Sequence, residues 1–124
     1  RVLRVEAPPF ASTSKGVAGS VGRVLCCAPS SVEGFTDVAI GLAGLVAGSL
    51  DVNDGAALVA GLAKIADHYA AKAAGAGTAQ DARVTLRDAA DALDAASLAA
   101  RCTLDALDVV AADTHTHAVT VAAA

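Results

Sequence analysis

The stretch from Val38 to Leu50, VAIGLAGLVAGSL, contains no charged residue and predicts a helix that is apolar on every side. Glycines fall on one face of this helix and larger aliphatic side chains on another. The two sets are Gly41, Gly44 and Gly48, and Leu42 and Val46. A helix without a polar face lies at the centre of its own fold, at a subunit interface or in a membrane. The choice among these three settings decides both the fold class and the class of function.

The glycines make the interface the preferred setting. A glycine inside a helix costs about 1 kcal/mol relative to alanine, so close packing against a neighbour must compensate. We therefore predict a protein–protein interface formed by this helix and its first turn. Its residues are Phe35, Gly41, Leu42, Gly44, Val46 and Gly48. Ser30 and Glu33 form a capping-box pattern that would begin the helix.

The composition predicts a single domain over residues 1–124 with a core of small side chains. Hydrophobic residues make up 55% of the chain, whereas aromatic residues make up only 2%. Because a buried alanine contributes much less than the roughly 1.5–3 kcal/mol of a larger aliphatic side chain, such a core is thin for its length. We expect a partner, a homo- or hetero-oligomer, to supply the missing stability.

Charge and cysteine content narrow the possible partners. The formal net charge of −4 argues against nucleic acid, because phosphate binding requires a basic patch. No uncharged run reaches the roughly 20 residues of a membrane-spanning helix, so we expect no membrane span. The three cysteines do not form a disulfide framework. These features predict a soluble protein of a reducing compartment or of a particle.

Two further helices are predicted between residues 51 and 112. In the first, Leu58, Leu62, Ile65 and Tyr69 repeat at spacings of four and three, and Gly75 and Gly77 would end it in the manner of a left-handed cap. Thr78 with Asp81 begins the second. Its apolar positions are predicted to face the core; they are Leu86, Ala90, Leu93, Ser97, Ala100, Leu104 and Leu107. Its charged positions are predicted to face solvent, among them Arg87, Asp91, Asp94, Arg101, Asp105 and Asp108.

The two ends of the chain alternate in polarity and predict short strands. Residues 1–6 alternate apolar and charged side chains before Pro8 and Pro9, and residues 21–27 form a second apolar run within an N-terminal strand region of about 1–28. Alternation returns over residues 114–121. The predicted fold class is α+β, mostly α, with a three-helix core over about residues 30–112 and strands near both termini.

The C-terminal alternation contains the string Asp113-Thr-His115-Thr-His117, which predicts a possible metal site. On a strand, all three side chains share one face and could bind zinc or another divalent metal. The string resembles the first metal-binding strand of amidohydrolase-type barrel enzymes. That barrel takes about 200 residues or more to build, and only residues 118–124 follow the string, so the resemblance does not imply the barrel here.

Two classes of function follow. The first is a non-enzymatic structural or assembly subunit, such as a virion- or capsid-associated protein or an accessory subunit, which needs no cofactor and docks through the glycine-faced helix and the terminal strands. The second is a small metal-binding protein or metal-dependent enzyme that uses Asp113, His115 and His117. The first hypothesis requires self-association or a permanent partner, and the second requires bound metal.

Overall fold

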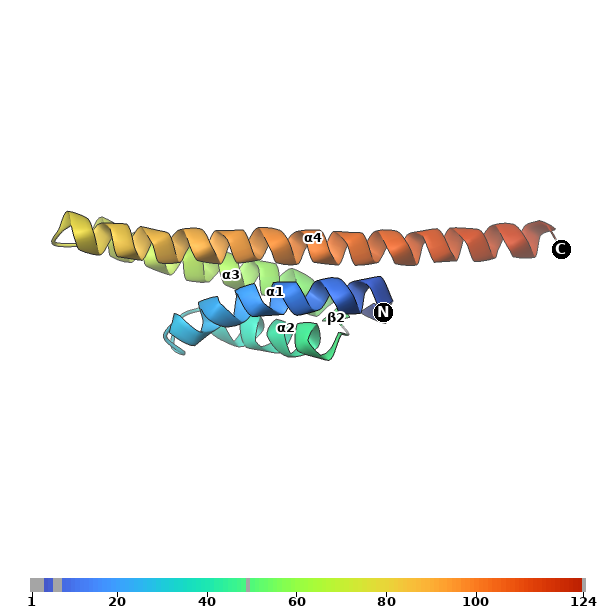
Figure 1. Cartoon of the computed structure of the whole chain (residues 1–124), viewed down its shortest axis with the longest axis horizontal. Helices are drawn as coiled ribbons and strands as arrows, with labels where there is room; N and C mark the ends of the chain where they lie inside the picture. Colours follow the sequence, from blue (N-terminus) through green and yellow to red (C-terminus); the bar gives the residue numbers. More distant parts are fainter. Residues whose placement is uncertain (1–3, 6–7, 49, 124) are drawn as a thin grey trace.

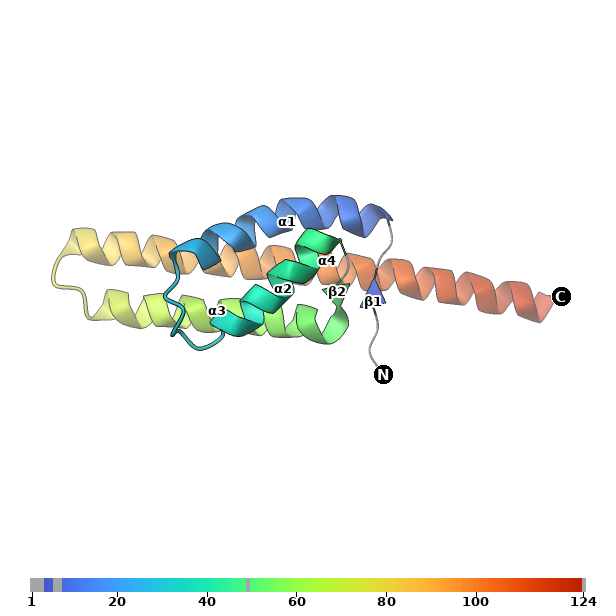
Figure 2. The same ribbon diagram turned by 90° about the horizontal axis from the view of Figure 1, so that it is seen from below.

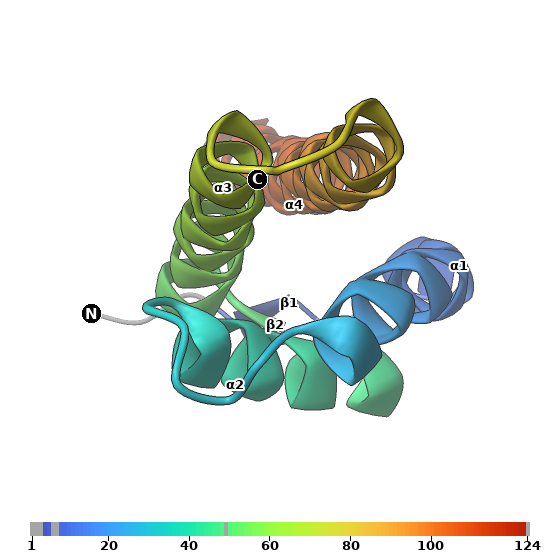
Figure 3. The same cartoon turned by 90° about the vertical axis from the view of Figure 1, so that its left-hand side faces the viewer.

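In the part of the chain that the structure describes, four helices pack in two layers. The computed structural model describes the backbone of residues 4–5, 8–48 and 50–123, and the side chains of residues 15–48, 50 and 52–108. The helices are α1 (Pro8–Cys27), α2 (Phe35–Ala47), α3 (Val52–Ala74) and α4 (Ala79–Ala123). Helices α3 and α4 form one layer, and α1 and α2 form the other (Figure 3). No helix of the described chain combines the length and the hydropathy needed to cross a bilayer.

Helix α3 and the first half of α4 form an antiparallel hairpin at the centre of the fold (Figure 1). The predicted α3 stripe is confirmed, because Leu58, Leu62 and Ile65 are fully buried and Tyr69 is nearly so. The hydroxyl oxygen of Thr78 accepts a hydrogen bond from the amide of Asp81 at 3.1 Å, which caps the start of α4. The two helices therefore begin close to where the sequence patterns place them.

Glycines bring α2 onto α3 at short range, and α2 crosses α3 obliquely (Figure 2). A Cβ atom placed on Gly41 would lie 2.6 Å from the Cβ of Leu58. At the start of α2, a Cβ on Gly61 would lie 2.7 Å from the carbonyl oxygen of Gly34. Real Cβ atoms do not approach so closely, so glycine is required at both contacts for the two backbones to meet.

The α+β prediction is wrong, since the described chain is all-helical apart from one two-residue ladder. In that ladder β1 (Arg4–Val5) pairs antiparallel with β2 (Leu50–Asp51), with Arg4 opposite Asp51. The predicted strand at residues 21–27 is part of α1. Two adjacent prolines suit the first turn of a helix, where backbone amides have no partner. The buried residues of α1 recur at the helical spacing of four and three, at Val17, Val21 and Val24.

The predicted C-terminal strand is also wrong, because α4 runs through residues 114–121 to Ala123. No glycine or proline interrupts the sequence after Gly77, so nothing in the local chemistry ends the helix early. The 45 residues of α4 span about 67 Å at 1.5 Å per residue. Its C-terminal part extends well beyond the other three helices (Figure 1).

Two predicted helix ends also need correction. Helix α2 begins after Gly34, whose φ of 93° is left-handed, and no side chain caps it, so Ser30 and Glu33 do not form the predicted capping box. Among the described residues, only Gly34 and Gly48 have positive φ, so neither Gly75 nor Gly77 is the predicted left-handed cap of α3. The left-handed cap lies instead at the end of α2, at Gly48.

Candidate functional site

Helix α4 has two apolar faces that differ in size and in burial. The buried face consists of small side chains: Ala89, Ala92, Ala95, Ala96, Ala99, Cys102 and Ala106. The leucines lie elsewhere, and Leu86, Leu93 and Leu104 remain 53%, 54% and 58% exposed. The prediction that this leucine stripe faces the core is therefore wrong.

The large residues of α3 explain this orientation. Leu58, Leu62 and Ile65 are fully buried in the same core cluster as the α4 alanines, and Leu58 also lies against Gly41 of α2. Interiors pack at nearly crystalline density, so large side chains on one helix require small ones opposite. Alanines on α4 meet this requirement, and the leucines on its far side are left without a partner in the described chain.

The exposed face of α4 follows a regular heptad spacing. Its seven apolar or small positions alternate in steps of four and three: Leu86, Ala90, Leu93, Ser97, Ala100, Leu104 and Leu107. We call these residues the α4 seam. Ala100 and Leu107 are half-buried, and the other five are exposed. Such a repeat is the pattern by which two helices pack knobs into holes.

Charges of alternating sign border one side of the seam. Arg87, Asp94, Arg101 and Asp108 lie one residue after every second seam position, and all four are exposed. Within the part of the chain whose side chains are described, the single ion pair joins Lys64 and Glu33 at 3.2 Å. Arg87 with Asp91 and Arg101 with Asp105 are spaced four residues apart on α4, but neither pair forms an ion pair in this part of the chain. The charges beside the seam are free to contact another molecule.

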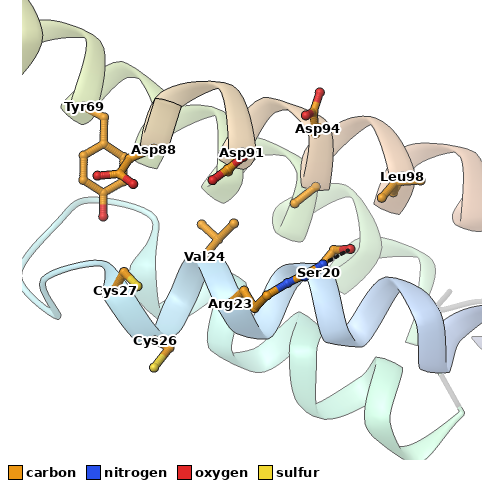
Figure 4. Close-up of a pocket in the computed structure, with 11 residues that line it drawn as sticks. Ser20, Arg23, Val24, Cys26, Cys27, Tyr69, Asp88, Asp91, Asp94 and Leu98 are labelled. Atoms are coloured by element: carbon orange, nitrogen blue, oxygen red, sulfur yellow. Dashed lines mark hydrogen bonds between the residues drawn. The ribbon is translucent and has the colours of Figure 1, made fainter. Parts of the chain in front are cut away.

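A cleft of about 590 Å³ lies between α4 and α1, on the same side of the seam as these charges (Figure 4). Asp88, Asp91 and Asp94 line the α4 wall. The opposite wall comes from α1 and carries one cation, Arg23, whose guanidinium donates a long 3.4 Å hydrogen bond to the hydroxyl of Ser20. The cleft is therefore acidic on one side only.

Tyr69 of α3 lies at one end of this cleft, near Asp88 and Cys27 (Figure 4). Burial raises the pKa of the Tyr69 phenol above its ordinary value of 10.0, and the charges of Asp88 and Cys27 raise it further. Burial, followed by Asp105, likewise raises the pKa of the Cys102 thiol. The phenol and the buried thiol therefore stay protonated at neutral pH. Neither of them is activated as a nucleophile or base.

The predicted interface on α2 is only partly accessible. Gly41 is buried against Leu58 of α3, and Leu42 packs partly against the core. Phe35, Gly44 and Gly48 are half-buried, whereas Val46 is 66% exposed. Gly41 of the glycine face thus meets a helix of the same chain. An external partner of α2 stays a prediction.

The predicted metal residues lie on the C-terminal part of α4. The backbone of Asp113, His115 and His117 is helical, but their side chains lie outside the described part of the molecule. Residues two apart on a helix are about 200° apart around its axis, so the strand geometry that aligned all three does not hold. Among the side chains that are described, no three His, Cys, Asp or Glu residues are grouped closely enough to hold a metal ion. The metal site stays a prediction.

Comparisons with known proteins give no match to a protein-family model, to a curated protein or to a solved structure. Functional inference therefore rests on the chemistry of this chain's own residues.

Proposed function

We propose that the chain is a non-enzymatic structural subunit of a larger protein assembly and that it docks through the α4 seam. The observation that carries this proposal is the orientation of α4, which buries alanines and presents Leu86, Leu93 and Leu104 to solvent. Exposed leucines in a continuous helical stripe mark a protein-interaction surface more often than a solvated one. The glycine-faced α2 is not needed for docking in this proposal, and neither are terminal strands.

The cleft between α1 and α4 does not favour an enzymatic role over this one. The phenol of Tyr69, at one end of the cleft, is shifted away from ionisation at neutral pH and so is not prepared to act as a base. By contrast, the seam combines heptad spacing, large apolar side chains and unpaired flanking charges. These three features are typical of a helix surface that packs against a second helix.

The experiment is sedimentation velocity of the purified chain from about 1 to 200 μM. We expect oligomers whose population grows with concentration by mass action. The double variant Leu93→Asp and Leu104→Asp should be monomeric over this range, because it places carboxylates in the apolar seam.

A matched control keeps the interpretation specific to the seam. Val84 is 49% exposed on α4 but lies outside the repeat, so Val84→Asp should leave the oligomer intact. Circular dichroism of each variant checks that the helices still form. A wild-type chain that stays a folded monomer at every concentration would contradict the proposed function, as would an oligomer that persists in the seam variant.

A further inference from the structure

We propose that the occupant of the α4 seam is the α4 helix of a second copy, packed antiparallel about a two-fold axis in one register. This inference rests on the proposed function and specifies the partner. Two-fold dimers are the commonest closed assemblies of identical chains, and their interfaces are self-complementary. The seam can therefore be tested for complementarity against itself, using only its own sequence and exposure.

The seam has two kinds of position, those that follow a step of four residues and those that follow a step of three. In an antiparallel pair of helices, each position of the first kind lies opposite a position of the second kind. In the proposed register, Leu104 packs on the partner's Leu93, and Leu93 on the partner's Leu104. Ala90 then lies opposite the partner's Leu107, which pairs a small side chain with a large one. Ser97 meets the partner's Ala100 near the two-fold axis. The two exposed leucines thus form paired layers on either side of a narrow centre.

Charge complementarity selects this register. It sets Asp94 beside the partner's Arg101 and Arg87 beside the partner's Asp108, and the two-fold axis repeats both contacts. All four pairs then join opposite charges, on side chains that are exposed and form no ion pair within the described chain. Flanking charges of a coiled coil set the orientation and the choice of partner in this way.

Registers shifted by one heptad bring like charges together. A shift in one direction sets Asp94 against the partner's Asp94 and Arg87 against the partner's Arg101. A shift in the other direction sets Asp94 against the partner's Asp108 and Arg101 against the partner's Arg101. Because the sign alternates along the helix, both shifts replace attraction with repulsion.

A parallel dimer gains nothing from these charges. In that orientation each flanking charge faces the opposite flank of the partner helix, which is occupied by Ala82, Ala89, Ala96 and Thr103. None of these residues is charged. Three of them also lie on the side of α4 that faces the rest of the chain, since Ala89 and Ala96 are buried and a Cβ on Gly55 of α3 would lie 3.1 Å from the hydroxyl of Thr103.

A charge-swap cycle tests the proposal by sedimentation equilibrium of the full chain. Asp94→Arg alone and Arg101→Asp alone should each weaken dimerisation about tenfold or more, because each turns two attractive contacts into repulsive ones. The double variant Asp94→Arg with Arg101→Asp should restore the dimer to within about threefold of wild type. Ala63→Arg, an exposed change on α3, is the control for added charge and should leave the dimer unchanged.

Disulfide trapping tests the orientation independently. In a background with the exposed Cys26 and Cys27 changed to Ser, an equal mixture of the Ala90→Cys and Leu107→Cys chains should form a mixed disulfide on mild oxidation. Ala90→Cys alone should not form one with itself, since the antiparallel register separates the two copies of position 90 by about 25 Å.

The outcomes separate this inference from the proposed function. A double swap as weak as the single variants, or efficient self-trapping of Ala90→Cys, would overturn the antiparallel register while leaving the seam as a docking surface. An oligomer that the Leu93→Asp and Leu104→Asp variant does not disrupt would overturn the proposed function itself. Restoration by the swap together with the mixed disulfide supports both.

Discussion

Helices α3 and α4 pack against each other, yet they bury opposite kinds of residue. Helix α3 buries large side chains, Leu58, Leu62 and Ile65 among them, whereas α4 buries alanines and leaves Leu86, Leu93 and Leu104 exposed. The difference teaches that hydrophobic size alone does not orient a helix. When one helix already fills the space between two backbones, its neighbour is selected for a small face. Larger residues on the neighbour are then available for another partner.

The most disruptive test of this comparison removes a large side chain from α3. Leu62→Ala should destabilise the chain by about 2–5 kcal/mol, because it leaves a cavity that the facing alanines are too small to fill. The matched change Leu93→Ala on α4 should cost less than about 0.5 kcal/mol within a single chain. Urea unfolding measures both, at a dilution where the midpoint no longer depends on protein concentration. Equal losses would show that α4 buries its leucines after all.

The converse test adds a large side chain to the small face of α4. Ala99→Leu should cost about 1–3 kcal/mol, since the buried alanine has no room for three more carbons. Ala63→Leu makes the same change at an exposed position of α3 and should lie within about 0.5 kcal/mol of wild type. Thermal unfolding compares the two. A neutral Ala99→Leu would mean that the hairpin is loosely packed.

The contact between α2 and α3 gives a smaller version of the same contrast. Gly41→Ala should destabilise by about 1–3 kcal/mol, because its new methyl group would meet the Cβ of Leu58. Gly19→Ala, on α1, has no neighbour within 4 Å and should stabilise by about 0.5–1 kcal/mol through helix propensity. Opposite signs in urea unfolding are the expected result, and a stabilising Gly41→Ala would contradict the close approach.

The smallest expected effect concerns Tyr69, which is the only tyrosine of the chain. Its folded pKa lies above 10.0, so the fold favours the neutral phenol. Stability from this residue is fully present below pH 10.0 and declines as the pH rises from there through the folded pKa. Phenolate absorbance at 295 nm should show a midpoint above 10.0 in the folded chain and an ordinary one in urea.

The neighbours of Tyr69 sharpen that titration. Asp88→Asn should lower the folded midpoint but not to its ordinary value, because burial is the larger cause of the shift and Asp88 the smaller. Asp81→Asn, far outside the cleft, is the control and should leave the midpoint unchanged. A folded midpoint at or below 10.0 would show that the phenol is not buried between α3 and α1.

The sequence predicts the hairpin well and the rest less well, for physical reasons. The α3 stripe is unambiguous because its large residues share one face and its other faces are small or polar. The predicted strands of the N-terminal region are wrong for two reasons. Adjacent prolines can either end a strand or begin a helix, and valines favour strands locally. In α1 the packing of Val17, Val21 and Val24 against the other helices overrides that local preference.

The sequence shows the repeat of the seam residues, but it does not show whether the seam faces the core or the solvent. Helix α4 carries two stripes with helical spacing, one of leucines and one of alanines, and the leucine stripe is the stronger hydrophobic signal. Only the large residues of α3 decide which stripe turns inward. The informative signal in the sequence is therefore a helix with large apolar residues next to a helix with an alanine stripe. In such a pair, the alanine stripe is expected to face the neighbour, and any leucine stripe on the same helix is expected to face outward.

The short loop of residues 75–78 has a consequence for the order of folding. It joins α3 to α4, so their contacts close a small loop and lose little chain entropy, whereas α1 meets α4 only across more than 50 intervening residues. We expect the hairpin to form in the transition state and α1 to dock afterwards. Leu62→Ala should then mainly slow folding, and Val21→Ala should mainly accelerate unfolding, in stopped-flow kinetics.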